Sequence, residues 1–241
     1  MTDRPALNDP GFVAEQYRST ARLDVRRSVW QPPPPGESAQ DVAVAALAEV
    51  GPVALLEVGC GTGELAERCA RELGCRVVAL DQSPAMVDVT AARGVEAMVG
   101  DVQALPFADG SFDCALAAWM LYHVPDLERG LAELRRVLRP GGRLVAITNG
   151  HRGMAELLVP AGLVRPPATF SRENGAELLA PYFDEVAQID LRSTGLVPDA
   201  AVARAYLEST GYRPDPERLE RLDWPLEVTG TPTVFIAGVA V

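Results

Sequence analysis

The residues with the most distinctive chemistry form a turn with glycines at alternate positions, Gly59-Cys60-Gly61-Thr62-Gly63. A short apolar segment, 54–58, precedes the turn, and a helix through about Leu73 is predicted to follow it. Glycine lets the backbone approach a ligand closely and adopt conformations that a Cβ atom disfavours. The first N–H groups of a helix have no partner within the helix and can bind a ligand. The pattern therefore predicts a ligand-binding turn at the end of a buried strand.

Three acidic residues accompany successive predicted strands. Glu57 lies in the first strand, Asp81 ends the second and Asp101 follows the third. The carboxyl ends of parallel strands meet at one edge of a sheet, and open sheets bind ligands there. Glu57 suits an ammonium group, Asp81 two ribose hydroxyls and Asp101 an adenine amino group. The set predicts a ligand with amino, ribose and adenine donors, although Asp81 and Asp101 could also cap helices.

A nicotinamide or flavin enzyme is the first alternative, because these proteins also use a glycine-rich turn. Their dinucleotide fingerprint has a third glycine where this sequence has Glu64. A carboxylate at the start of that helix would repel a pyrophosphate. The sequence therefore favours a ligand without phosphate.

Six ordered segments together carry a family resemblance: 57–63, 81–86, 100–107, 111–113, 120–126 and 138–142. With them the stretch from Leu55 to Asn149 resembles the core of class I S-adenosylmethionine-dependent methyltransferases acting on small molecules, the ubiquinone/menaquinone-type group. The resemblance implies an α/β, Rossmann-like fold: a seven-stranded, mostly parallel sheet with an antiparallel last strand, helices on both faces and an N-terminal helical cap. It also implies transfer of a methyl group from S-adenosyl-L-methionine to an oxygen, nitrogen or carbon nucleophile of a small molecule, with S-adenosyl-L-homocysteine as product.

The resemblance further implies a cofactor site. The glycine turn would hold the methionyl part, Asp81 the ribose, and Gln82 and Met86 the adenine. Tyr17 and Arg26 resemble an N-terminal segment that closes over the cofactor, although any amphipathic helix contains such residues. The complete predicted set is Tyr17, Arg26, Glu57, Gly59, Cys60, Gly61, Gly63, Asp81, Gln82, Met86, Asp101, Val102, Ala118 and Trp119.

Three residues are candidate general bases: His123, His151 and Glu173. Methyl transfer from a sulfonium depends mainly on alignment and a dry site, but an O–H acceptor would benefit from a base. Each candidate has a structural alternative: His123 could orient its loop, His151 could be a solvated loop residue, and the stretch around Glu173 could reflect a helix capped by Ser171. With two histidines and no C-x-x-C pair, the sequence predicts no metal site.

The order of predicted elements divides the chain. Residues 1–36 form a helical cap that ends in a proline-rich linker, and 37–241 form the cofactor-binding domain. Strands are expected at 54–58, 76–80, 95–99, 112–117, 143–148, 185–191 and 233–241, and helices at 84–92, 126–138, 171–179 and 199–209. Residues 151–180 are a predicted substrate-side insertion, and the cap and 151–170 are expected to form the acceptor pocket.

Composition narrows the partners. The formal charge of -11 and the absence of lysine, all 22 basic residues being arginine, disfavour nucleic-acid binding and exclude lysine-based chemistry. The sequence lacks a signal-peptide pattern and a long apolar stretch, so we expect a cytoplasmic protein without a membrane segment. The four cysteines are expected to be small buried hydrophobes. Nothing in the sequence predicts an oligomeric state.

A protein that binds S-adenosylmethionine without transferring the methyl group is the remaining alternative, because a fold does not determine an activity. Nucleic-acid methylation is disfavoured further, because the stretch 117–120 lacks the family's asparagine-proline-proline-aromatic motif for base amino groups.

Overall fold

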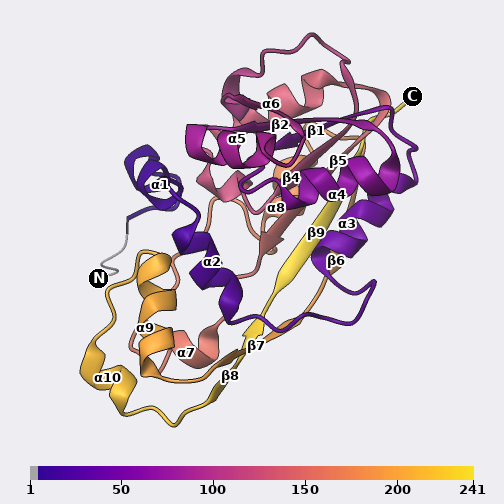
Figure 1. Ribbon diagram of the computed structural model, residues 1–241. Coiled ribbons are helices and arrows are strands. Elements are labelled where there is room, and N and C mark those ends of the chain that lie inside the picture. The colour runs from indigo at the N-terminus through magenta and orange to yellow at the C-terminus, as the bar shows by residue number, and fades with distance from the viewer. Residues whose placement is uncertain (1–4) are drawn as a thin grey trace.

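A computed structural model describes residues 5–241, which contain a seven-stranded sheet in the order β3-β2-β1-β4-β5-β9-β6 (Figure 1). Strands β1 to β5 are parallel, and β9 runs antiparallel to both β5 and β6. The predicted fold class is thereby confirmed, whereas residues 1–4 of the predicted cap lie outside the described residues. The strands of this sheet are β1 (Ala54–Val58), β2 (Arg76–Asp81), β3 (Glu96–Val99), β4 (Phe112–Ala118), β5 (Leu138–Asn149), β6 (Glu185–Asp190) and β9 (Pro232–Gly238).

The central strands form because their sequences are almost continuously apolar. Leu55, Leu56 and Val58 of β1 are fully buried, as is typical of parallel strands covered on both faces. β1 pairs with β2 on one side and with β4 on the other. The strand order therefore reverses beside β1, and the turn after β1 opens at the point where such sheets bind ligands.

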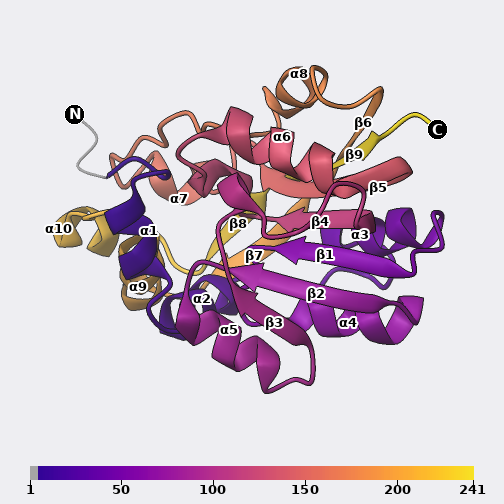
Figure 2. The same cartoon turned by 90° about the horizontal axis from the view of Figure 1, so that it is seen from above.

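Helices cover both faces of the sheet (Figure 2). α3 (Ala39–Ala48) and α4 (Glu64–Leu73) pack one face through Leu47 and Cys69. α6 (Leu127–Val137) and α8 (Gly175–Leu179) pack the other face. α5 (Pro84–Ala91) lies against β2 and β3, and the short helices η1 (Val102–Ala104) and η2 (Leu121–His123) follow β3 and β4. All four cysteines are buried and unpaired, as predicted.

The N-terminal segment lies across the carboxyl edge of the sheet. It contains α1 (Pro10–Gln16) and α2 (Ala21–Ser28), where the sequence predicted one helical stretch. Trp30 forms an isolated bridge with Gly195, and the Gln31 N–H donates to the Thr194 carbonyl at 3.0 Å. The proline-rich linker then leads to α3, which begins with a reciprocal capping box between Ser38 and Asp41.

A second packed region, here called the distal lobe, is built from α7 (Ala155–Leu158), β7 (Ser193–Val197), α9 (Ala200–Ser209), α10 (Pro216–Glu220) and β8 (Leu226–Gly230). β7 and β8 pair as a two-stranded antiparallel sheet. The lobe has its own apolar core, which includes Leu157, Leu207 and Tyr212 and is separate from the two cores on the main sheet. Figure 1 shows it below the carboxyl edge of the main sheet.

Two local predictions need correction. Ser171 does not cap the helix that follows it, because α8 begins at Gly175. The side chain of Asn174 instead accepts hydrogen bonds from the Ser171 N–H at 2.7 Å and the Ser171 hydroxyl at 3.0 Å. The fifth strand also begins earlier than predicted, at Leu138, which pairs with Phe112 before the register shifts.

Candidate functional site

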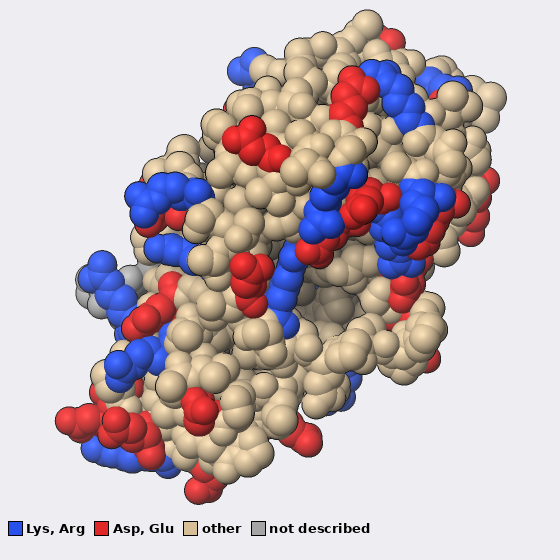
Figure 3. All heavy atoms as spheres, in the orientation of Figure 1, with Lys and Arg blue, Asp and Glu red and all other residues tan. Residues whose placement is uncertain are grey.

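A cavity of about 860 Å³ lies between the carboxyl edge of the main sheet, the N-terminal segment and the distal lobe. Figure 3 shows the molecular surface hollowed between its upper and lower parts, with charged side chains of both signs nearby. Ligand sites occupy about 300–1,000 Å³. The cavity therefore has room for a nucleoside-sized cofactor together with a second small molecule.

The glycine turn forms one wall of this cavity. Gly59 and Gly63 have φ values of +65° and +73°, and a Cβ atom at either position would lie 2.6 Å from Met120 or Thr90, respectively. Gly61 has a φ of +54°, but a Cβ atom there would meet no protein atom within 4 Å. Gly59 and Gly63 are therefore required by packing. Gly61 leaves open space beside the backbone, which a ligand could occupy.

Asp81 fixes the turn from the neighbouring strand. Its Oδ2 accepts a hydrogen bond from the Gly61 N–H, and its Oδ1 accepts one from the Ser83 N–H, both at 2.9 Å. Burial raises the pKa of the Asp81 carboxyl despite these bonds. Ser83, rather than Asp81, is the N-cap of α5. The carboxylate keeps acceptor capacity on both oxygens, since each oxygen has two lone pairs.

Glu57 is the most unusual group in the site. It is 2% exposed, and its Oε2 is buried without a hydrogen-bond partner. Burial, and then the nearby charge of Asp81, raise the pKa of Glu57 to about 8. A buried polar atom without a partner is costly. A ligand that brings an ammonium group would satisfy it.

The N-terminal segment contacts the glycine turn through Arg27, and it contacts neighbouring elements through Arg26 and Tyr17. Arg27 donates to Thr62 Oγ1 at 3.1 Å and to Glu64 Oε1 at 2.9 Å. Arg26 turns toward α9, where its Nε donates to the Ser209 carbonyl at 3.1 Å. The Tyr17 carbonyl accepts from the Ser83 hydroxyl at 2.8 Å. The sequence predicted Tyr17 and Arg26, but the residue that contacts the turn directly is Arg27.

His123 is held from both sides of its ring. Its Nδ1 lies 2.7 Å from the Leu7 carbonyl oxygen, and its Nε2 lies 2.8 Å from the Tyr17 hydroxyl. A carbonyl oxygen can only accept, so Nδ1 donates, and Nε2 of the neutral ring accepts the Tyr17 proton. His123 therefore meets the cavity together with Tyr17, as a hydrogen-bonded pair.

His151 and Glu173 form a second pair. The His151 backbone N–H donates to Glu173 Oε1 at 2.9 Å, and His151 Nδ1 lies 3.5 Å from Glu173 Oε2. Burial acts to raise the pKa of Glu173, but hydrogen bonds from the His151 N–H and from Ser171 outweigh it, so the pKa lies below its usual value. Only His151 of this pair lines the cavity. Glu173 is placed to orient the histidine from behind.

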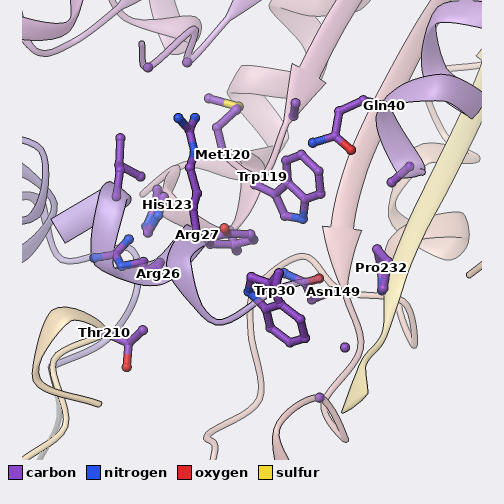
Figure 4. A pocket seen from close by; sticks show the side chains of 18 of the residues that line it. Arg26, Arg27, Trp30, Gln40, Trp119, Met120, His123, Asn149, Thr210 and Pro232 are labelled. Atoms are coloured by element: carbon purple, nitrogen blue, oxygen red, sulfur yellow. The ribbon is translucent and has the colours of Figure 1, made fainter. Parts of the chain in front are cut away.

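Backbone strain is concentrated at the cavity. Among the described residues, the non-glycine residues with positive φ are Trp119, at 53°, and Met154, at 64°, and both line the cavity. Such strain is rare and tends to occur at functional sites. Trp119 follows β4 and Trp30 follows α2, so the two indoles reach the site from distant parts of the chain (Figure 4).

Most of the predicted site residues line the cavity. They are Tyr17, Arg26, Glu57, Gly59, Cys60, Gly61, Asp81, Gln82, Val102, Ala118, Trp119, His123 and His151. Gly63, Met86, Asp101 and Glu173 do not line it. Met86 is fully buried in α5, and Asp101 caps η1 by accepting from the Gln103 N–H at 2.9 Å.

Sequence reasoning missed several lining residues, among them Gln16, Arg27 and Arg165. No spacing rule singles these residues out, because contacts with remote segments place them. Within residues 5–241 no helix is long and apolar enough to cross a membrane. No group of three or more acidic, cysteine or histidine residues that could hold a metal occurs in that range either.

Comparison with known proteins agrees with the geometry. Residues 56–146 match the family model described as a methyltransferase domain. Over 179 residues the chain is 32% identical to 27-O-demethylrifamycin SV methyltransferase of Amycolatopsis mediterranei, covering 70% of this chain and 62% of that protein. Over 159 residues it is 39% identical to demethylmenaquinone methyltransferase of Thermobifida fusca, covering 59% and 63%.

The chain spans between 28% and 63% of the lengths of its curated relatives. Among solved structures, the [4+2]-cyclase SpnF superposes with a TM-score of 0.63 at 21% identity, over 100% of both chains. This likeness concerns the fold alone. The predicted resemblance to class I methyltransferases is confirmed, since residues 56–146 match the methyltransferase domain model and the two relatives are methyltransferases.

Proposed function

We propose that this protein is an S-adenosyl-L-methionine-dependent methyltransferase that acts on a small molecule. The observation that carries the proposal is the unpaired, buried Oε2 of Glu57, which belongs to the strand that leads into the glycine turn. An amino acid cofactor that brings an ammonium group to this point would supply the missing partner.

The residues present fit this cofactor. Glu57 would hold the ammonium group, the backbone at Gly59 and Gly61 the methionyl part, and Asp81 the ribose hydroxyls. When bound, the cofactor supplies a sulfonium methyl group, whose carbon–sulfur bond breaks as the acceptor nucleophile bonds to the carbon and S-adenosyl-L-homocysteine is left. Gln82 and Val102 line the cavity beyond Asp81 and are the candidates for the adenine.

The chain contributes mainly alignment, exclusion of water and a route for a proton. The N-terminal segment and Trp119 would cover the reacting groups. For an O–H acceptor, the Tyr17 hydroxyl oxygen would accept the acceptor proton while its own proton passes to His123 Nε2, which already receives that hydrogen bond. His151, oriented by Glu173, is the second candidate base.

The acceptor side of the site is the part of the cavity nearest the distal lobe. Two relatives are named as methyltransferases of 27-O-demethylrifamycin SV and of demethylmenaquinone, which supports a small-molecule acceptor here. The net charge of -11 argues against a nucleic-acid acceptor. We infer that the protein works in the cytoplasm, where the cofactor is made and used.

Calorimetric titration with S-adenosyl-L-methionine, S-adenosyl-L-homocysteine and NAD tests the proposal. We expect both adenosyl compounds to bind and NAD not to bind. Hydrogen bonds to charged groups contribute about 1.5–3 kcal/mol, so Asp81→Ala should weaken binding by about ten- to a hundredfold. Asp88→Ala, an exposed carboxylate on α5, is the matched control. Failure of both adenosyl compounds to bind would refute the assignment of the cofactor.

Because the fold also occurs in the [4+2]-cyclase SpnF, binding of the cofactor alone does not establish methyl transfer. The activity is tested by incubating the protein with S-adenosyl-L-methionine carrying a labelled methyl group and a library of small hydroxyl, amine and carboxylate compounds. Transfer of label to any acceptor supports the proposal. Cofactor binding without transfer to any of them would favour a cofactor-binding protein that does not methylate.

A further inference from the structure

Buried polar atoms without hydrogen-bond partners indicate where the acceptor molecule binds, as Glu57 Oε2 does for the cofactor. Among the described residues, three buried side-chain atoms lack a hydrogen-bond partner: Gln16 Nε2, Glu57 Oε2 and Arg165 Nε. All three residues line the same cavity. Glu57 offers an acceptor, whereas Gln16 and Arg165 offer donors. The two donors therefore call for a ligand that brings acceptor atoms.

Gln16 is held in a defined orientation. It is 2% exposed, and its Oε1 accepts a hydrogen bond from the Arg26 guanidinium. Arg26 is itself fixed by the Ser209 carbonyl at the end of α9. Because the oxygen end of the amide is occupied, the Nε2 end is the one left for a ligand. A buried amide that donates nothing is costly, so the arrangement indicates a bound oxygen atom.

Arg165 is a guanidinium with no carboxylate partner within ion-pair distance in the described part of the chain. Its neighbour Val164 accepts a hydrogen bond from the Tyr212 hydroxyl at 3.5 Å, which places this segment beside the end of α9. Gln16 reaches the same end of α9 through Arg26 and Ser209. Both unpartnered donors thus connect to the residues at and just after the end of α9, on the distal-lobe side of the cavity.

That part of the cavity, here called the acceptor wall, is otherwise largely apolar or aromatic; it consists of Trp30, Met154, Leu158, Arg165, Tyr206 and Tyr212. The acidic residues of the cavity lie elsewhere. Glu57 and Asp81 stand at the strand ends, Glu64 pairs with Arg27, and Glu37 belongs to the proline-rich linker. None of the four acidic residues that line the cavity belongs to the acceptor wall, whose charged residue is Arg165.

We propose, building on the methyl-transfer function above, that the acceptor molecule is an apolar or aromatic compound with a carboxylate, which is bound by Arg165 of the acceptor wall and by Gln16 of the N-terminal segment. A guanidinium pairs with a carboxylate through charge-assisted, often bidentate hydrogen bonds. Arg26, the guanidinium that contacts Gln16, already donates to Gln16 Oε1 and to the Ser209 carbonyl. The unpartnered donors are then one guanidinium and one amide, which match the single charge of a carboxylate better than the double charge of a phosphate monoester. The carboxylate serves as the handle that positions the acceptor, and Arg165 is the residue that selects for it.

The test uses 2-naphthoate, methyl 2-naphthoate and 2-naphthyl phosphate as probes, titrated calorimetrically into the whole protein saturated with S-adenosyl-L-homocysteine. We expect 2-naphthoate to bind at least tenfold more tightly than its methyl ester and more tightly than the phosphate. Arg165→Gln and Gln16→Leu should remove this preference, and Arg165→Lys should keep part of it. Arg213→Gln, an exposed arginine near the same lobe, should leave the preference unchanged.

Several outcomes would overturn the proposal. These are the absence of 2-naphthoate binding, equal binding of acid and ester, tighter binding of the phosphate, or an unchanged preference in Arg165→Gln. A loss of S-adenosyl-L-homocysteine affinity in Arg165→Gln would assign this arginine to the cofactor instead. If the wild-type protein binds no S-adenosyl-L-homocysteine, the cofactor assignment fails. The comparison of 2-naphthoate with its methyl ester, made without S-adenosyl-L-homocysteine, would then still test whether the cavity binds a carboxylate.

Discussion

At the scale of single residues, the site is defined by groups that the folded chain leaves unsatisfied. Glu57 is the clearest case, because its charged form is disfavoured by burial and by the neighbouring Asp81. A folded protein tolerates such a group only if the rest of the structure compensates for its cost. The pKa of about 8 makes this cost measurable without any ligand.

Between pH 4.5, the ordinary pKa of a glutamate, and pH 8 the folded state holds a proton on Glu57 that the unfolded state has lost. Unfolding therefore releases a proton, and stability falls as pH rises through this range. We expect urea denaturation to show that the free energy of unfolding falls by on the order of a few kcal/mol between these two pH values. Glu57→Gln should flatten this decline, whereas the exposed Glu177→Gln should not. An equal slope in the Glu57→Gln protein would show that other groups cause the decline.

The glycines of the turn make a second residue-scale prediction, because they are needed for different reasons. A Cβ atom at Gly63 would lie within 3 Å of the Thr90 side chain and backbone, whereas one at Gly61 enters open space. Gly63→Ala should therefore destabilise the protein more than Gly61→Ala, in which only the positive φ costs about 1–3 kcal/mol. Conversely, Gly61→Ala should weaken S-adenosyl-L-homocysteine binding more strongly. Thermal denaturation would compare the stabilities of the two variants, and calorimetry would compare their affinities for S-adenosyl-L-homocysteine. A more stable Gly63→Ala protein, or tighter binding by Gly61→Ala, would show that the two glycines do not have these separate roles.

At the scale of elements, most strands of the main sheet could be predicted because each is a short apolar run followed by a recognisable turn. The missed pair, β7 and β8, joins 193–197 to 226–230. The sequence of β7 has no apolar–polar alternation, and the alternation in β8 spans only the four residues 226–229. Their pairing depends on the distal core that forms around α9. The site shows the same limit: Gln16 is oriented through Arg26 by the carbonyl of Ser209, 183 residues further along the chain from Arg26.

One of the hydrogen bonds that attach the N-terminal segment to the domain can be tested by mutagenesis. The Tyr17 hydroxyl and His123 Nε2 join residues 106 positions apart. Tyr17→Phe should cost about 0.5–1.5 kcal/mol and should speed tryptic cleavage at Arg18 and Arg22. In a double-mutant cycle with His123→Asn, the combined loss should be smaller than the sum of the single losses. Strict additivity would show that the pair does not act as a unit.

At the scale of the whole molecule, the main sheet and the distal lobe have separate apolar cores, and the cavity lies between them. The glycine turn, Glu57 and Asp81 belong to the sheet. Arg165, Tyr206 and Tyr212 belong to the distal side. Under the proposed function the cofactor binds on the sheet side and the acceptor on the distal side, so the two binding functions should respond separately to damage in one core.

Leu207→Ala removes a fully buried side chain from the distal core and should cost about 2–5 kcal/mol. Because the proposed contacts Glu57, Gly61 and Asp81 lie on the sheet side, affinity for S-adenosyl-L-homocysteine should change less than threefold, while 2-naphthoate binding should fall at least tenfold. Leu134→Ala, in the core of the main sheet, is the matched control. It should reduce affinity for S-adenosyl-L-homocysteine at least as much as that for 2-naphthoate. Parallel loss of both affinities in Leu207→Ala would mean that the two halves form one cooperative unit, and the separate placement of cofactor and acceptor would then not hold.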